Sequence, residues 1–281
     1  MQNQPQNPND NLNNPLQLKS EQVVKNQFNL SALLLNALDD DAIISQAYSS
    51  FHNYSLLNQS LAAFQLMLRF GKLSPIASYK AWQEKGRQVK KNEKAIALYM
   101  PVTFKKKNNE TEQDTESNDD EVYTKIILRN NWFCLDQTEG EEYIPEIKIP
   151  SWNAEKAMAV LDIVEIHFDS VNGNCMGFAK NNQIAINPLN PLKHKTRFHE
   201  MAHILLGHTK DTYLSENADL PKSIKEVEAE GVAFLMLNLL NLDGKKESRG
   251  YIQGWLQGNP ISEESAKRIF TVTDKLFKAG Q

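Results

Sequence analysis

Apolar residues recur at helical spacing over residues 29–70, and the pattern then changes to the alternation that is typical of strands. Leu57, Leu61 and Phe64 fall three or four positions apart, which places them on one face of a helix. The stretches "AIALYMPVTF" and "VYTKIILRNNWFCLDQT" have the composition and alternation of strands. The first half of the chain is therefore predicted to be a small α+β domain.

The second half is predicted to be mainly helical, with a small sheet near its start. A helical pattern covers residues 153–165, and "VEIHFDS" and "QIAIN" alternate as strands after it. Two long helical patterns follow, over about 191–208 and 221–241, and a helical tail covers 262–278. The predicted fold class is α+β, a small α+β domain followed by a mainly helical domain with a small β-sheet.

Two polar segments and a proline-containing connection set the predicted domain limits. Residues 1–28 are rich in Asn, Gln and Pro, a composition typical of a disordered tail. Residues 110–121 carry seven acidic residues and neither a basic nor an apolar one, which predicts a loop over 108–121 between two strands. Because two prolines interrupt the connecting segment, the predicted domains cover residues 29–145 and 150–281.

Composition excludes several classes of protein. The chain has 281 residues, of which 41% are hydrophobic and 23% charged, and its net charge is −4; these values are typical of a globular protein. With only Cys134 and Cys175, neither a disulfide framework nor a cysteine-rich zinc ribbon is supported. The N-terminus lacks the pattern of a signal peptide, and no apolar run approaches the roughly 20 residues that span a bilayer. We therefore expect a cytoplasmic protein with no membrane partner.

The sequence HEMAH at residues 199–203 has the pattern of a catalytic metal site. His199 and His203 are one helical turn apart and point the same way, so their ring nitrogens can share one ion. Glu200 lies beside that ion, where its carboxylate can act as the general base. Such a site has three protein ligands and one open position, and its usual ion is Zn²⁺. The motif predicts a zinc metallopeptidase, and the strand "QIAINP" is predicted to border the cleft and to align an extended peptide.

The third ligand must come from another segment. His208 follows His203 by five residues, one fewer than the metzincin pattern requires, so it is predicted to be a polar residue at the helix end. Glu226 and Glu230 share a helix face, and a buried carboxylate needs a partner. We predict Glu230 as the third ligand because it enters an apolar run, and Glu226 as a group that orients a ligand histidine. The alternative is an exposed acidic cluster at a helix start.

A basic stretch in the first half, residues 72–107, contains ten Lys or Arg residues and two Glu, interleaved with aromatic side chains. Positive charge neutralises phosphates and aromatic faces stack on bases, the combination found in proteins that bind single-stranded DNA. The candidate DNA-contacting residues are Trp82, Arg87, Lys90, Lys91, Lys94 and, on the preceding helix, Tyr54 and Asn58. The alternatives are a core position for Trp82 and a merely solvated charged face.

These motifs together resemble the ArdC-type antirestriction proteins of mobile elements. The matching stretches are "FHNYSLLNQ", "YKAWQEKGRQVKKNEKAIALYMP" and "FCLDQTEGEE" in the first half, and "GFAKNNQIAIN", "RFHEMAHILLGH" and "KEVEAEGVAFLM" in the second. The resemblance implies an N-terminal single-stranded-DNA-binding domain and a C-terminal zincin-like metallopeptidase domain. It also implies that His199, His203 and Glu230 hold the metal and that Glu200 is the base. The last two stretches are similar to the ImmA/IrrE metallopeptidases as well.

The predicted function is that of an antirestriction protein that binds single-stranded DNA without strong sequence preference and carries a zinc-dependent peptidase domain. The sequence does not identify its protein or peptide substrate. Two alternatives stay open. One is a regulatory metalloprotease of the ImmA/IrrE type that cleaves a DNA-bound repressor. The other is a non-enzymatic single-stranded-DNA-binding protein in which zinc is structural.

Overall fold

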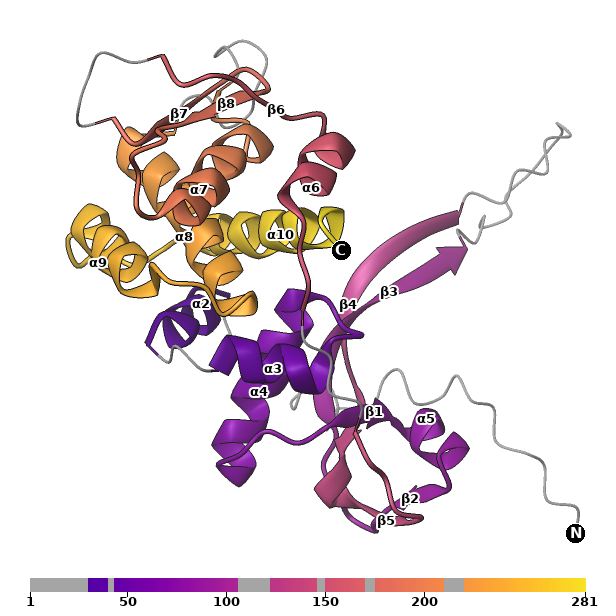
Figure 1. Ribbon diagram of the computed structural model, residues 1–281. Helices are drawn as coiled ribbons and strands as arrows, with labels where there is room; N and C mark the ends of the chain where they lie inside the picture. Colours follow the sequence, from indigo (N-terminus) through magenta and orange to yellow (C-terminus); the bar gives the residue numbers. More distant parts are fainter. Residues whose placement is uncertain (1–29, 40–42, 106–121, 146–149, 170–174, 210–219) are drawn as a thin grey trace, which may run out of the picture. The chain divides into compact units, whose positions relative to one another are not determined.

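The computed structural model describes most of the chain as helices and small sheets (Figure 1). The described residues are 30–39, 43–105, 122–145, 150–169, 175–209 and 220–281. The predicted tail and the acidic run lie outside them. The described part divides into two compact units, of which Ser74–Ile144 forms the smaller, while the chain before and after it forms the larger. The predicted α+β class is confirmed.

The smaller unit is built around a long β-hairpin. Its elements are β1 (Ile76–Ser78), α5 (Tyr79–Glu84), β2 (Arg87–Val89), β3 (Ile96–Lys105), β4 (Val122–Cys134), a 3₁₀ turn at Leu135–Gln137 and β5 (Thr138–Gly140). β3 and β4 pair antiparallel over ten residues of β3, and β4 also pairs with β1, which gives the strand order β1-β4-β3. β2 and β5 form a separate two-stranded sheet. The sequence correctly predicts both long strands, because their β-branched and aromatic residues suit a pleated surface.

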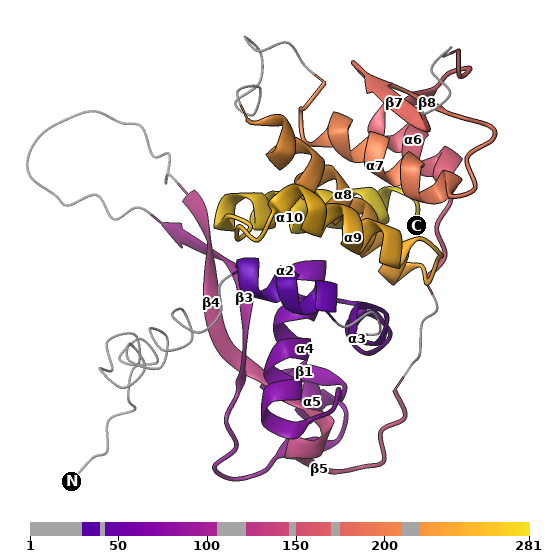
Figure 2. The ribbon, with the colours of Figure 1, turned by 90° about the vertical axis from the view of Figure 1, so that its left-hand side faces the viewer.

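The larger unit is a bundle of helices with a small sheet on one side (Figure 2). Its helices are α2 (Leu30–Asp39), α3 (Ile43–Phe51), α4 (Leu56–Phe70), α6 (Ala154–Leu161), α7 (Lys193–Leu205), α8 (Lys222–Leu239), α9 (Lys245–Leu256) and α10 (Glu263–Ala279). Every residue of α8 from Val227 to Leu239 is buried, since α3, α7, α9 and α10 all pack against it. The segment from Gly231 to Leu239 is apolar apart from Asn238, as expected of a helix at the centre of a core. None of the helices described is long and apolar enough to cross a bilayer.

A three-stranded sheet packs against α7 (Figure 1). Its strands are β6 (Val164–Glu165), β7 (Gly177–Lys180) and β8 (Gln183–Ile186), in the order β6-β8-β7. β6 runs parallel to β8, and β7 runs antiparallel to it. β8 matches the predicted strand "QIAIN", but it is the central strand, and β7 is an edge strand of this sheet.

Two acidic residues of α10 attach the N-terminal helices to the C-terminal part of the chain. The carboxylate of Glu263 accepts hydrogen bonds from the backbone N–H groups of Leu30 and Ser31, at 2.8 and 3.0 Å. Asp274 accepts one from the N–H of Leu56, at 3.1 Å. Both carboxylates therefore cap the positive end of a helix. Because α2, α3 and α4 belong to the larger unit, the compact units do not coincide with the predicted division at residues 145–150.

Candidate metal centre

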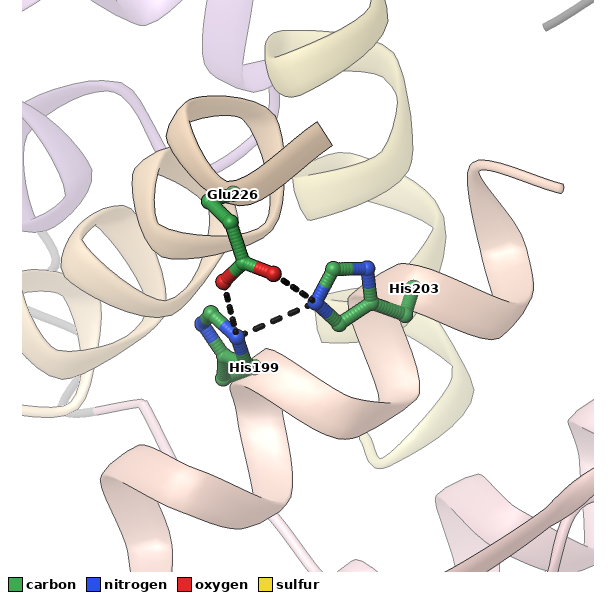
Figure 3. Close-up of side chains that lie close together, drawn as sticks. All are labelled: His199, His203 and Glu226. Atoms are coloured by element: carbon green, nitrogen blue, oxygen red, sulfur yellow. Dashed lines mark hydrogen bonds and ion pairs between the residues drawn. The ribbon is translucent and has the colours of Figure 1, made fainter. Parts of the chain in front are cut away.

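The two histidines of the HEMAH motif and a glutamate of α8 converge on one point (Figure 3). The Nε2 atoms of His199 and His203 are 3.1 Å apart, as their spacing of one helical turn predicts. From the facing helix, the Glu226 carboxylate lies 3.4 Å from His199 Nε2 and 3.9 Å from His203 Nε2. One donor atom from each of the three side chains lies within 4.8 Å of the other two.

This donor set fits a divalent cation. Two imidazole nitrogens and one carboxylate oxygen are ligands that Zn²⁺ and related ions accept. The two ring nitrogens at 3.1 Å need either a proton or a cation between them, because two facing lone pairs repel each other. Glu226 adds a negative charge at the same point, and the three side chains are each less than one-fifth exposed. The geometry of His199 and His203 is as predicted, and their role as ligands stays a prediction.

Glu226 lies at the converging nitrogens, where Glu230 was predicted, and Glu230 lies behind a histidine, where Glu226 was predicted. Glu230 is only 1% exposed, so the expectation that it is the deeper of the two is correct. Its depth, however, places Oε2 2.9 Å from His199 Nδ1, the ring nitrogen opposite the converging atoms. Its other oxygen forms an ion pair with Lys195 at 2.7 Å. The structure therefore does not bring Glu230 to the converging atoms as predicted for the third ligand, because its carboxylate contacts the back of the His199 ring, and Glu226 lies beside the two Nε2 atoms instead.

Burial and neighbouring charge shift the proton affinities of this cluster. Burial raises the pKa of Glu200 to about 7, against the lowering effect of His199. Burial lowers the pKa of His199, but contacts with Glu226 and Glu230 outweigh it and raise the value to about 9. For His203 burial dominates, and with the charge of His199 it lowers the pKa to about 3. A carboxyl group with a pKa near neutrality can both accept and return a proton.

A pocket of about 790 Å³ opens on the cluster. Its wall includes Glu200, which is 8% exposed, and Tyr251 of α9, which lies beside His199 with the two ring centres 6.4 Å apart. Gly177, Phe178 and Ala179 of β7 form another part of the wall. The strand that borders the pocket is therefore β7, and the prediction that "QIAINP" does so is wrong, because β8 is covered by β7 on that side.

The position of His208 against His203 was not predicted, although the sequence contains a signal for it. Gly207 follows α7 with a φ of 77°, and its N–H donates to the carbonyl of Ile204 at 3.0 Å. The N–H of His208 donates to the carbonyl of His203 at 2.9 Å. These two bonds define a Schellman motif, which returns the chain over the last helical turn. A glycine directly after the helix therefore predicts that His208 lies against His203.

Two of the predicted DNA-contacting residues are structural. Trp82 is 1% exposed, and its indole N–H donates to the carbonyl of Phe133 at 2.8 Å, so its interpretation as a base-stacking residue is wrong. The guanidinium of Arg87 bonds to the hydroxyl of Thr138 at 2.8 Å and to the carbonyls of Thr138 and Glu141. These bonds join β2 to β5, and they use three of the five N–H donors that were expected to meet phosphates.

The other candidates fall in both units. Lys90, Lys91 and Lys94 are exposed in the smaller unit, where Lys90 donates to the carbonyl of Asp136 at 3.0 Å. Tyr54 and Asn58 are half-buried in the larger unit. Their role in DNA binding stays a prediction.

The hairpin of the smaller unit carries a second aromatic and basic surface. The strand register places Phe104 opposite Tyr123, and their rings stack with centroids 5.6 Å apart and planes 20° apart. Lys125 Nζ lies 5.3 Å from the Tyr123 ring centroid, and Arg129 follows on the same face of β4. We call Phe104, Tyr123, Lys125 and Arg129 the hairpin face. The sequence does not show this face because the register of β3 against β4 cannot be read across residues 106–121.

Comparisons with known proteins agree in both halves. The family model described as the N-terminal domain of anti-restriction factor ArdC matches residues 36–131. Among solved structures, the metal-free crystal structure of the antirestriction protein ArdC from plasmid R388 has a TM-score of 0.53 and 17% identity, covering 89% of this chain and 93% of that chain. The Mn(II)-bound structure has a TM-score of 0.51 and 16% identity, covering 89% and 97%. No functionally curated protein matches. The fold of ArdC therefore extends over most of this chain.

Proposed function

We propose that this chain, which is of the ArdC type by its N-terminal domain and its fold, is an antirestriction protein with a metal-dependent peptidase site and a surface for single-stranded DNA. The observation that carries the peptidase part is the convergence of His199, His203 and Glu226 beside the buried carboxyl group of Glu200. All four side chains line one open pocket. Two ligand histidines on one helix and an adjacent glutamate are the donor and base arrangement of zinc peptidases.

His199, His203 and Glu226 would hold the ion, which we propose is Zn²⁺. When bound, the ion supplies a Lewis acid that polarises a peptide carbonyl and activates water. Glu200 takes the proton of the attacking water and passes it to the amine as the C–N bond breaks, for which a pKa of about 7 is suited. Glu230, which forms an ion pair with Lys195, lies behind the His199 ring. The phenol of Tyr251 is the group of the pocket wall that we assign to the oxyanion.

The substrate of this site is proposed to be an extended segment of a protein. β7 borders the pocket and is an edge strand, so its outer side can pair with an extended peptide through backbone hydrogen bonds. Such pairing would lay the peptide across the pocket without requiring a particular side chain. Phe178 of β7 adds an apolar wall beside it. The identity of the cleaved protein does not follow from these features.

The DNA-binding part is assigned to the hairpin face. Stacked aromatic rings and an adjacent cation are the features on which unpaired bases and phosphates bind. Tyr123 is 43% exposed, and Lys125 and Arg129 are exposed next to it. Every base has a flat face, so this mode of binding is tolerant of sequence. Lys90, Lys91 and Lys94 remain candidates for additional phosphate contacts.

The peptidase part is tested with Glu200→Gln. The variant should bind Zn²⁺ like the parent chain in calorimetry, because Glu200 is not among the proposed ligands. Hydrolysis of a fluorogenic peptide library should fall by about 10²- to 10⁴-fold, the usual contribution of a general base. If hydrolysis survives the change, Glu200 is not the base. If the parent binds Zn²⁺ firmly and cleaves nothing, the ion is structural, as in the non-enzymatic alternative.

The DNA part is tested with Tyr123→Ala, followed by fluorescence anisotropy of a labelled single-stranded oligonucleotide. Loss of one stacking platform should weaken binding by about 1–3 kcal/mol, or roughly 5- to 150-fold. The matched control is Ile126→Ala, because Ile126 is 73% exposed on the opposite face of the same strand. Equal affinity of the two variants would exclude the hairpin face as the binding surface.

Cleavage of one DNA-bound repressor, without general hydrolysis, would favour the regulatory-protease alternative.

A further inference from the structure

A buried series of polar side chains leads away from the metal centre behind His203. His203 Nδ1 lies 3.0 Å from His208 Nδ1, and His208 Nε2 lies 3.2 Å from Glu228 Oε2. The other oxygen of Glu228 accepts a hydrogen bond from Arg268 Nε of α10, at 3.0 Å. The side chains of His208 and Glu228 are 2% and 0% exposed. The proposed peptidase chemistry does not use any of these last three groups.

The donors and acceptors in this series have one consistent order when His208 is neutral. An ionised carboxylate can only accept, so the proton between Glu228 and His208 must lie on His208 Nε2. The guanidinium of Arg268 balances the charge of Glu228, so the imidazole does not have to be a cation to satisfy it. A neutral imidazole with its proton on Nε2 has a lone pair on Nδ1. His208 therefore presents an acceptor to His203.

This acceptor determines which nitrogen of His203 carries a proton. The two Nδ1 atoms can form a hydrogen bond at 3.0 Å only if one of them donates, and His208 Nδ1 is the acceptor. His203 must then carry its proton on Nδ1. Its Nε2, which faces His199 and Glu226, then carries the lone pair and accepts the hydrogen bond from His199 Nε2 in the metal-free protein. That nitrogen is the one that a cation would need.

We propose that His208 is a positioning residue that fixes the Nδ1–H tautomer of His203 and thereby keeps Nε2 available to a metal ion. Glu228 and Arg268 in turn fix the tautomer of His208. Behind the other histidine, Glu230 Oε2 lies 2.9 Å from His199 Nδ1. Groups placed behind ligand histidines in this way orient the ring and select its tautomer. The inference takes only the presence of a metal ion from the proposed function. The tautomers themselves are properties of the metal-free protein.

The Schellman motif makes this arrangement dependent on one glycine. Gly207 has a φ of 77°, which other residues adopt at a cost, and the reversal it permits places His208 against His203. In many helices the corresponding contact is between two apolar side chains. Here both side chains are histidines, so the motif that ends α7 also brings His208 into contact with His203 of the metal centre.

The first test is made on the metal-free full-length chain and needs no substitution. The chain has six histidines, so long-range ¹H–¹⁵N spectra of ¹⁵N-histidine-labelled protein can resolve each ring. We expect His203 with its proton on Nδ1 and His208 with its proton on Nε2. A proton on Nε2 of His203 would overturn the proposal. This result does not depend on whether the protein binds a metal or cleaves a peptide.

The second test measures Zn²⁺ and Mn²⁺ binding to folded variants by calorimetry. His208→Leu removes donor and acceptor and should weaken binding by about 10- to 100-fold, the usual effect of groups behind a ligand. His208→Gln keeps one amide donor and one amide acceptor and should restore part of the loss. His194→Leu, an exposed histidine at the start of α7, is the matched control and should bind like the parent chain.

The outcomes separate this inference from the proposed function. Parent-like affinity in folded His208→Leu would overturn the inference and leave the peptidase proposal intact. Absence of metal binding in the parent chain would overturn the peptidase proposal, and the tautomer spectrum would still decide the role of His208. If His208→Leu does not fold, the spectrum and the His208→Gln titration carry the test. A folded His208→Gln variant that binds the metal no better than His208→Leu would count against the inference as well.

Discussion

At the candidate metal centre, His199, His203 and Glu226 converge in a pocket, and a further polar group lies behind each of the two histidines. On the hairpin face, Phe104 and Tyr123 stack on each other on two exposed strands. The first region requires several helices to be in place, whereas the second requires only the register of one hairpin. We therefore expect large, coupled effects of substitution at the centre and smaller, more independent effects on the hairpin.

The largest effect is expected from comparing the two glutamates of α8. Glu226→Gln removes a proposed ligand and should weaken Zn²⁺ binding by more than the roughly 10- to 100-fold that is typical of groups behind ligands. Glu230→Gln should fall within that range, because Glu230 contacts only the back of His199. Calorimetry on both variants measures the difference. A greater loss for Glu230→Gln would restore the original prediction from sequence.

The pH dependence of metal binding should be nearly as large. The Glu226 and Glu230 carboxylates raise the pKa of His199 to about 9, so its ring is protonated at neutral pH in the metal-free protein. A ligand nitrogen must be unprotonated, so affinity should fall about tenfold for each pH unit below 9. Binding at pH 7.5 should release about one proton, measured by calorimetry in buffers of different ionisation enthalpy. Affinity that does not change between pH 7 and 9 would contradict this.

What the sequence could predict differs between these regions for a physical reason. His199, Glu200 and His203 follow from the helical period alone, and the structure places them as expected. Glu226 and Glu230 share a helix face, so the choice between them depends on how α8 crosses α7, which no local pattern contains. The prediction from sequence chose the glutamate with the more apolar neighbours. That choice identified the deeper residue, Glu230, whereas Glu226 lies beside the two Nε2 atoms.

The smaller unit shows the same limit. Trp82 and Arg87 both lie in a basic and aromatic stretch. The fold nevertheless buries Trp82 in the core, and Arg87 links β2 to β5. Composition describes a stretch as a whole and does not say which of its side chains face inward. The attachment of α2 and α4 through Glu263 and Asp274 is equally hidden, because those contacts join residues more than 200 positions apart.

The smallest effect is expected from the acidic run that follows β3 in the sequence. Residues 109–121 include seven acidic residues, and they lie outside the described part of the chain. Their deletion should tighten binding of a single-stranded oligonucleotide by a few-fold at low salt, because negative charge competes with phosphates for the same cations. The gain should vanish at high salt, where charges are screened. Unchanged affinity in low-salt anisotropy titrations would remove this role for the acidic run.

The most direct test of the central claim is the position of the ion itself. Crystals of the full chain grown with Zn²⁺ or Mn²⁺ would be measured at the absorption edge of the metal. We predict one anomalous peak within coordination distance of His199 Nε2, His203 Nε2 and the Glu226 carboxylate, with Glu230 outside that distance. A peak coordinated by Glu230, or no peak at these residues in metal-saturated protein, would contradict the account.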